Sequence, residues 1–151
     1  MNAESCWLMK SVIGPLTVFE SDGVVNEIRF GAYAEDVADN AISRQLYEYF
    51  AGDRKSFDVR IEPRGTKFHR DVWNALLKIP YGETRSYSEI ARAIGRPAAI
   101  RAVGAANGAN PIPIVIPCHR VIGSNGSLTG FGGGIDVKRR LLELEAGYRL
   151  F

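Results

Sequence analysis

The chain has 151 residues, enough for one sizeable hydrophobic core or for two small units that share an interface. With 46% hydrophobic and 24% charged residues, the composition is that of an ordinary globular protein and excludes extended disorder. No apolar run of about 18 residues and no secretory leader is found. We therefore expect a cytoplasmic protein that makes no membrane contact and keeps both cysteines, Cys6 and Cys118, reduced.

The charge is divided unevenly along the chain. Residues 1–63 carry six Lys and Arg against eleven Asp and Glu, whereas residues 64–151 carry thirteen against six. No acidic residue occurs between Glu89 and Asp136. A basic part joined to an acidic part favours contact with a polyanion such as nucleic acid, although charge alone leaves an accidental asymmetry open.

The first part of the chain is predicted to be strands and one helix. In chain order, the expected elements are strands over 16–20 and 24–30, a helix over 36–50 and a strand over 57–61. The hairpin signal is Ser21-Asp22-Gly23, between the first two strands. No reactive constellation occurs here, so we interpret residues 1–63 as a scaffold domain.

Residues 62–66 (Glu-Pro-Arg-Gly-Thr) are predicted to be a linker, and helices are expected beyond it. Apolar spacing predicts a helix over 68–79. Ser86, with Glu89 three residues later, predicts a capping box at the start of a second helix, which Gly95-Arg96-Pro97 ends. A third helix is expected over 98–106. Two short helices joined by a tight turn predict a helix-turn-helix.

The helix predicted over 98–106 is built almost entirely of small residues, and Arg101 is its only long polar side chain. Reading base edges usually requires several long hydrogen-bonding side chains. The helix therefore favours close approach to DNA with little sequence preference. Tight helix packing would explain the alanines equally well, but it leaves the lone arginine unexplained.

The most informative segment is 110–122, with the sequence NPIPIVIPCHRVI. Its prolines exclude a helix or a central strand, and its β-branched run over 112–116 should be buried. Cys118 is thus expected on a stiff, irregular backbone inside the core. Because burial alone raises the pKa of a thiol, His119 and Arg120 are expected to offset that effect.

His119 need not touch Cys118. Neighbouring side chains of an extended segment point to opposite sides, so we expect a bridging water. The imidazole then needs an orienting partner, for which Glu145, in a helix predicted over 138–146, is the first candidate and Glu143 the second. A buried structural cysteine beside a partly exposed histidine is the alternative interpretation.

Pro117-Cys118-His119-Arg120-Val121, preceded by Asn110-Pro111 and followed by Gly132-Gly133-Gly134, resembles the signature of the O6-alkylguanine-DNA alkyltransferases. The resemblance runs from about Phe68 to Glu145 and includes 72–73, 79–82, 86–87, 101–104 and 141–143. It implies an α/β (α+β) fold with a ribonuclease H-like domain over 1–63 and a winged-helix-like DNA-binding and alkyl-acceptor domain over 64–151.

The resemblance also implies a reaction. The protein would flip an O6-alkylguanine out of double-stranded DNA and move its alkyl group irreversibly onto its own Cys118, in a single turnover. O4-alkylthymine is a second candidate substrate. The protein would act as a monomer without a cofactor. The catalytic group implied is Cys118, His119, Glu145, Tyr87 and Asn110.

Roles follow from the same resemblance. His119 would act on Cys118 through water, Glu145 would orient His119, and Asn110 would bridge the DNA-binding helix to the cysteine segment. Arg101 would fill the space of the flipped guanine, while Tyr87 would help rotate the nucleotide and donate a proton to the departing base.

DNA contacts are implied for Ser86, Tyr87, Arg96, Ala99, Arg101 and Ala102, and a substrate pocket for Trp73, Pro113, Val121, Phe131 and Gly132. The carbonyls of Cys118 and Val121 would accept hydrogen bonds from the guanine amino group, and the loop over 127–134 would close the pocket.

The sequence departs from the family pattern at Phe131, where many members have Tyr, and at Asn107-Gly108-Ala109, which lacks the basic residue of several members. The zinc site of some relatives does not transfer, since no Cys/His cluster has ligand spacing, and we expect no metal.

Three rival functions predict other sequence features. A sensor of alkylguanine that does not react would lack a reactive cysteine, which is present here. A helix-turn-helix regulator would need a recognition helix rich in long polar side chains. A cysteine hydrolase would need direct Cys–His contact and an oxyanion hole, and it would turn over repeatedly.

Overall fold

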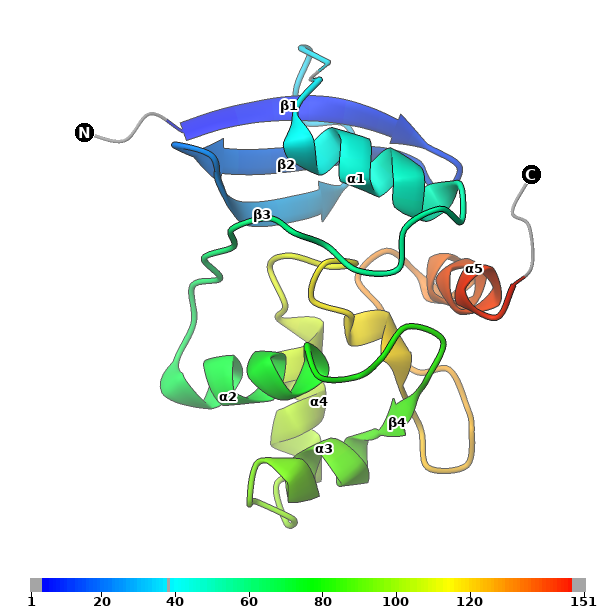
Figure 1. The fold of residues 1–151 in the computed structure, drawn as a ribbon. Helices are drawn as coiled ribbons and strands as arrows, with labels where there is room; N and C mark the ends of the chain where they lie inside the picture. Colours follow the sequence, from blue (N-terminus) through cyan, green and yellow to red (C-terminus); the bar gives the residue numbers. More distant parts are fainter. Residues whose placement is uncertain (1–3, 38, 148–151) are drawn as a thin grey trace.

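The structure is a computed structural model that describes residues 4–37 and 39–147, and it has the expected mixed α/β fold. Its first part is a three-stranded antiparallel sheet in the order β1-β2-β3, with bounds Glu4–Ser11, Gly14–Ser21 and Val24–Phe30. The turn between β2 and β3 places Asp22 and Gly23 at positive φ, as the hairpin signal predicts. The second part, mostly helical, lies below this sheet in Figure 1.

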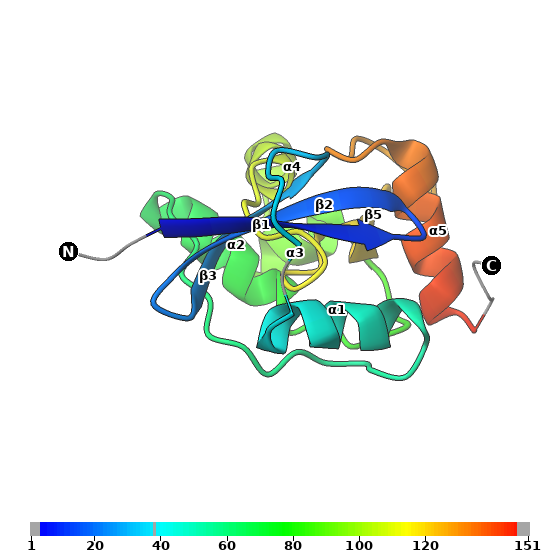
Figure 2. The ribbon, with the colours of Figure 1, turned by 90° about the horizontal axis from the view of Figure 1, so that it is seen from above.

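One face of the sheet forms part of the hydrophobic core. Trp7 and Met9 of β1 and Val18 of β2 are buried, in the alternating pattern of a half-covered sheet. The helix α1 (Ala41–Phe50) runs alongside the strands of the sheet in Figures 1 and 2 and buries its own apolar side. β1 was not predicted from the sequence.

Two predicted elements of this part need correction. The helix expected from residue 36 begins only at Ala41, because Asn40 and Ser43 form a capping box there. The strand expected over 57–61 is irregular. Only Ile61 makes a β-bridge, to Val25 of β3, so the segment does not join the sheet as a further strand.

The second part begins with α2 (Lys67–Leu76), which Thr66 caps at the end of the predicted linker. It continues with β4 (Arg85–Ser86), α3 (Tyr87–Ala93), α4 (Ile100–Gly108), a 3₁₀ turn η1 (Cys118–Arg120), β5 (Val121–Ile122) and α5 (Ile135–Glu145). The capping box between Ser86 and Glu89 is confirmed, and α3 and α4 form the expected helix-turn-helix. β4 and β5 pair in parallel and bring the start of α3 beside the cysteine segment.

The two parts are joined by main-chain and side-chain hydrogen bonds. The Ile28 N–H of β3 donates to the Pro111 carbonyl at 2.8 Å, and the Tyr49 hydroxyl of α1 donates to Glu145 of α5 at 2.6 Å. Within the described ranges, no helix is long and apolar enough to cross a membrane.

Candidate active site

The cysteine segment is buried and rigid, as its prolines predict. A turn closes over 112–116, where the Ile116 N–H donates to the Ile112 carbonyl at 2.9 Å. At its centre Ile114 has a φ of 75°, a strained value for a β-branched residue, held by complete packing of the side chain. The prediction of an extended backbone at Cys118 is wrong. Pro117 leads instead into the 3₁₀ turn η1, because the Arg120 N–H donates to the Pro117 carbonyl.

Two asparagines attach this segment to the end of α4. Asn110 donates to the Ile116 carbonyl at 2.8 Å and accepts from the Ile112 N–H at 2.9 Å, so it fixes the turn before Cys118. Asn107, which sequence reasoning missed, donates to the Cys118 carbonyl at 3.3 Å. The Asn107 bond links α4 directly to Cys118, while the Asn110 bonds hold the turn just before it.

His119 is fully buried, and its Nε2 lies 2.7 Å from the Glu145 Oε2. Glu145, at the end of α5, is therefore its carboxylate partner, whereas Glu143 is exposed. Burial lowers the pKa of His119, so the imidazole is neutral near neutral pH. Its other nitrogen, Nδ1, is buried and has no hydrogen-bond partner within the described part of the chain. A neutral imidazole with a free ring nitrogen can accept a proton there.

The Glu145 carboxylate is surrounded by donors. Arg120 binds both oxygens, with Nε at 2.7 Å from Oε1 and Nη2 at 3.0 Å from Oε2, and the Gly82 N–H reaches Oε1 at 3.2 Å. Burial by itself would raise the pKa of Glu145, yet the hydrogen bonds from His119 and Arg120 outweigh it and hold the pKa at about 2. The expectation that Arg120 would help ionise Cys118 needs correction, because its guanidinium is used by Glu145 and the Ile79 carbonyl.

Burial raises the pKa of the Cys118 thiol to about 11, against the opposing effects of a hydrogen bond from Asn110 and the charge of Lys138. The thiol is therefore protonated near neutral pH, and its proton must leave as it reacts. Lys138 was missed in the sequence. It is fully buried, and its Nζ donates to the carbonyls of Val121 and Thr129 at 2.6 and 2.9 Å.

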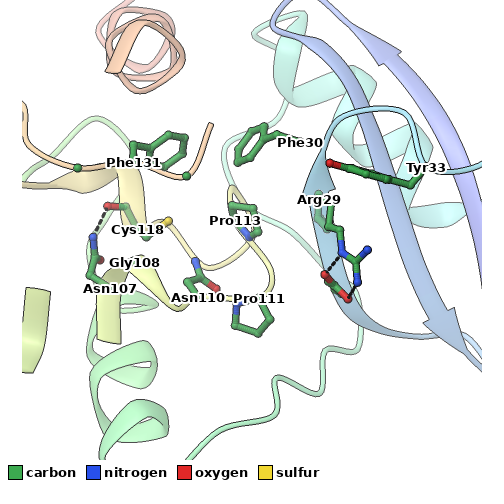
Figure 3. Close-up of a pocket in the computed structure, with 14 residues that line it drawn as sticks. Arg29, Phe30, Tyr33, Asn107, Gly108, Asn110, Pro111, Pro113, Cys118 and Phe131 are labelled. Carbon is green, nitrogen blue, oxygen red and sulfur yellow. Dashed lines mark hydrogen bonds and ion pairs between the residues drawn. The ribbon is translucent and has the colours of Figure 1, made fainter. Parts of the chain in front are cut away.

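A cavity of about 250 Å³ opens at Cys118. Figure 3 shows the sulfur directed into it, between Phe131 on one side and Asn110 and Pro111 on the other. Its lining comprises Glu27, Ile28, Arg29, Phe30, Tyr33, Asn107, Gly108, Asn110, Pro111, Pro113, Cys118, Gly130, Phe131 and Gly132. Of the predicted pocket residues, Pro113, Phe131 and Gly132 are in this lining.

The other two predicted pocket residues need correction. Trp73 lies in the core, where its Nε1 donates to the Ala106 carbonyl of α4 at 2.8 Å, and Val121 is fully buried. Neither lines the cavity.

The first part of the chain contributes Phe30 instead, whose ring meets Phe131 edge-on at 5.4 Å between ring centroids. Together with the contact between Tyr49 and Glu145, this shows that the first part is more than a scaffold.

The residues predicted to contact DNA lie on or near α3 and α4. Arg101 and Ala102 are exposed on α4, and Arg96 is exposed in the preceding turn. Ala99 is half-buried at the start of α4, whereas Ser86 is buried and its hydroxyl caps α3. Tyr87 is half-buried, and its phenol oxygen accepts a hydrogen bond from the Thr129 hydroxyl at 3.0 Å. Among the described residues, no group of His, Cys, Asp and Glu could hold a metal ion.

Fold and site together define a class of protein in which a buried cysteine, backed by a His–Glu pair, is attached to a helix-turn-helix. Residues 67–147 match the family described as 6-O-methylguanine DNA methyltransferase, DNA binding domain. The methylated-DNA–protein-cysteine methyltransferase of Methanosarcina acetivorans is 50% identical, over 91% of this chain and 96% of that protein. The protein of that name from Mycobacterium tuberculosis is 52% identical, over 89% and 88%.

Solved structures agree with this assignment. The crystal structure of Mycobacterium tuberculosis O6-methylguanine methyltransferase has a TM-score of 0.87 at 49% identity, covering 95% of this chain and 93% of that chain. A crystal structure of the Mycobacterium tuberculosis protein in complex with DNA has a TM-score of 0.86 at 51% identity, covering 93% and 92%. The chain belongs to the 6-O-methylguanine DNA methyltransferase family.

Proposed function

We propose that this protein repairs DNA by transferring the alkyl group of O6-alkylguanine to the sulfur of its own Cys118. The observation that carries the proposal is the geometry around this residue. The thiol faces a cavity, and the adjacent neutral His119 is bound through Nε2 to an ionised Glu145. Family membership and the relative crystallised with DNA support the same substrate class.

The target carbon is attached to a base inside stacked DNA, so the nucleotide has to leave the duplex before it can reach Cys118. The exposed Arg101 on the smooth helix α4 is suited to enter the duplex and occupy the gap. Because Asn107 and Asn110, at the end of α4, hold the cysteine segment, a helix docked on DNA also fixes the distance from the gap to the sulfur.

The thiol is activated by moving its proton to His119. With a pKa of about 11, Cys118 is not ionised beforehand. We infer that a water molecule carries the proton to the unpartnered Nδ1 of His119. The imidazolium that forms is stabilised by Glu145, whose carboxylate already binds the opposite nitrogen at 2.7 Å. The sulfur then forms a bond to the alkyl carbon while the bond from that carbon to O6 breaks, and guanine leaves with the electron pair.

The departing guanine anion needs a proton, for which Tyr87 is the candidate donor. Its phenol oxygen accepts a hydrogen bond from Thr129, so its own proton remains available for the base. The carbonyls of Cys118 and Val121 already accept one hydrogen bond each, from Asn107 and Lys138. Of these two residues only Cys118 lines the cavity, and its carbonyl oxygen has a second lone pair that can accept a hydrogen bond from the guanine amino group.

The product is a thioether, which is stable to the surrounding side chains, so we propose a single turnover. We also propose that the protein acts as a monomer. Phe131 and Pro113 would contact the flipped base, and O4-alkylthymine is proposed as a second substrate of the same cavity. A hydrolase mechanism is less well supported, because the Nε2 of His119 is bound to Glu145 and no direct contact with Cys118 is seen among the described residues.

Mass spectrometry tests the proposal. Incubation with an oligonucleotide that contains O6-methylguanine should add one methyl group per protein, on the peptide with Cys118. Cys6→Ser, which changes the exposed cysteine, should react like the natural protein, whereas Cys118→Ser should not be alkylated. Alkylation of the Cys118→Ser protein, or repeated turnover, would exclude this mechanism.

A further inference from the structure

We propose that Tyr49, in the first part of the chain, is a positioning residue of the acceptor site. Its hydroxyl fixes the carboxylate oxygen of Glu145 that binds His119. This inference rests on the proposed function, and it gives residues 1–63 a direct part in the proton transfer.

The geometry places three donors on one oxygen. The Oε2 of Glu145 accepts from the Tyr49 hydroxyl at 2.6 Å and from Arg120 at 3.0 Å, and it lies 2.7 Å from the Nε2 of His119. Arg120 and the Gly82 N–H hold the other oxygen. The donors around Oε2 therefore decide where the carboxylate lies relative to the imidazole.

The hydroxyl of Tyr49 is itself held in place. Its side chain, in the last turn of α1, is fully buried and packs against Phe50, Phe57 and Tyr81, with ring centroids 5.5, 5.5 and 6.2 Å away. Burial raises the pKa of Tyr49, and the negative charge of Glu145 raises it further, so the phenol stays protonated and acts as a donor. The packing of the Tyr49 ring thus fixes the position of the hydroxyl that binds the Glu145 carboxylate.

Removing the hydroxyl has two consequences for His119. The Glu145 oxygen loses a donor, so its negative charge is less spread and attracts the imidazole N–H more strongly, which favours the protonated ring. The carboxylate is also less firmly placed. A buried hydrogen bond is worth on the order of a three- to tenfold change in an equilibrium or rate. We expect Tyr49→Phe to slow alkyl transfer by about that factor and to move the acid limb of the pH–rate profile to higher pH.

The experiment measures alkyl transfer from free O6-benzylguanine across a range of pH, so that DNA binding does not enter. Tyr47→Phe is the matched control, since Tyr47 is an exposed tyrosine of the same helix and should give the natural profile. A Tyr49→Phe profile that superimposes on that of the natural protein would refute the positioning role, whatever its effect on thermal stability.

Two further measurements separate this role from simple packing. In a Glu145→Gln background, Tyr49→Phe should cause no additional change in rate, because the hydroxyl is proposed to act through that carboxylate. An undiminished effect in the double variant would overturn the proposal. Titration of the His119 ring nitrogens by NMR needs no alkyl transfer, and it should show a higher pKa in Tyr49→Phe. If the natural protein transfers no alkyl group but this shift is present, the proposed function fails while the positioning role stands.

Discussion

The ammonium group of Lys138 is bound to the carbonyl of Val121 inside the fold, at 2.6 Å. Val121 directly follows the 3₁₀ turn that contains Cys118, and the same ammonium binds Thr129 in the loop beside the cavity. The ammonium group of Lys138 in α5 therefore connects the cysteine segment, through Val121, to the loop that contains Thr129.

Replacing this cation should weaken the fold and slow the reaction. In Lys138→Met, two carbonyls lose their donor, and we expect the free energy of unfolding to fall by about 1–3 kcal/mol. The pKa of Cys118 should rise further, because a nearby positive charge that lowers it is lost. Urea unfolding measures the first effect, with Lys78→Met, an exposed position, as the control. Equal stability of the two variants would contradict this account of Lys138.

Alkyl transfer should depend on pH through His119. Burial lowers the pKa of His119, so the natural protein should keep a level rate from about pH 7 upward, and lose activity only as the imidazole is protonated at lower pH. In His119→Gln the thiol must ionise unaided, and with a pKa of about 11 only about one molecule in 10⁴ is a thiolate at pH 7. We expect its rate to fall by about 10²–10⁴-fold near pH 7 and to rise about tenfold per pH unit.

The measurement for His119 is the rate of reaction with free O6-benzylguanine. His69→Gln is the matched control, since His69 stacks on Trp73 in α2 and has no place in the proposed proton path. A His119→Gln profile parallel to that of the natural protein would show that the imidazole does not take the proton.

Arg101→Ala should separate nucleotide flipping from chemistry. Without this side chain the gap in the duplex is unfilled, and unpairing a nucleotide costs a few kcal/mol, so repair of duplex DNA should slow by about tenfold or more. Reaction with the free benzylated base should be retained. Arg139→Ala, which removes an exposed arginine of α5, serves as the control. An equal loss on both substrates would assign Arg101 to the pocket instead.

Tyr87→Phe should slow transfer by about 10²-fold, because the leaving base loses its proton donor. The variant also removes the hydrogen bond from Thr129. Thr129→Val removes that bond and keeps the phenol, so its effect should be clearly smaller. Both rates are measured with O6-methylguanine in DNA by mass spectrometry, and an unchanged rate in Tyr87→Phe would remove the phenol from the mechanism.

Local signals in the sequence predicted much of the fold. The hairpin turn before β3 and the capping box at Ser86 depend on a few adjacent residues, and both are found in the structure. The spacing over 57–61 predicted a strand, but alternation of side chains cannot show whether a partner strand has a free edge there. The start of α1 was placed too early, because the Asn40 cap decided it rather than the apolar spacing.

The site was predictable where its residues are adjacent in sequence, and less so where the fold brings distant ones together. The sequence suggested Glu145 as the partner of His119, but Tyr49 is 96 residues away from Glu145 in the chain, and its phenol carries no local signal. Arg120 was assigned to the thiol because it is close in sequence. In the structure, the tight turn at Cys118–Arg120 directs it to the carboxylate.

The hydrogen bond from the Ile28 N–H to the Pro111 carbonyl has a consequence for how the protein can be divided. A fragment that starts at residue 64 would keep the nucleophile and the helix-turn-helix. It would lose the strand that is hydrogen-bonded to Pro111, directly after Asn110, and also the phenol that binds Glu145. Chimaeras between relatives should therefore react well only when the donated amino-terminal half supplies both contacts, which makes this boundary a poor place for recombination.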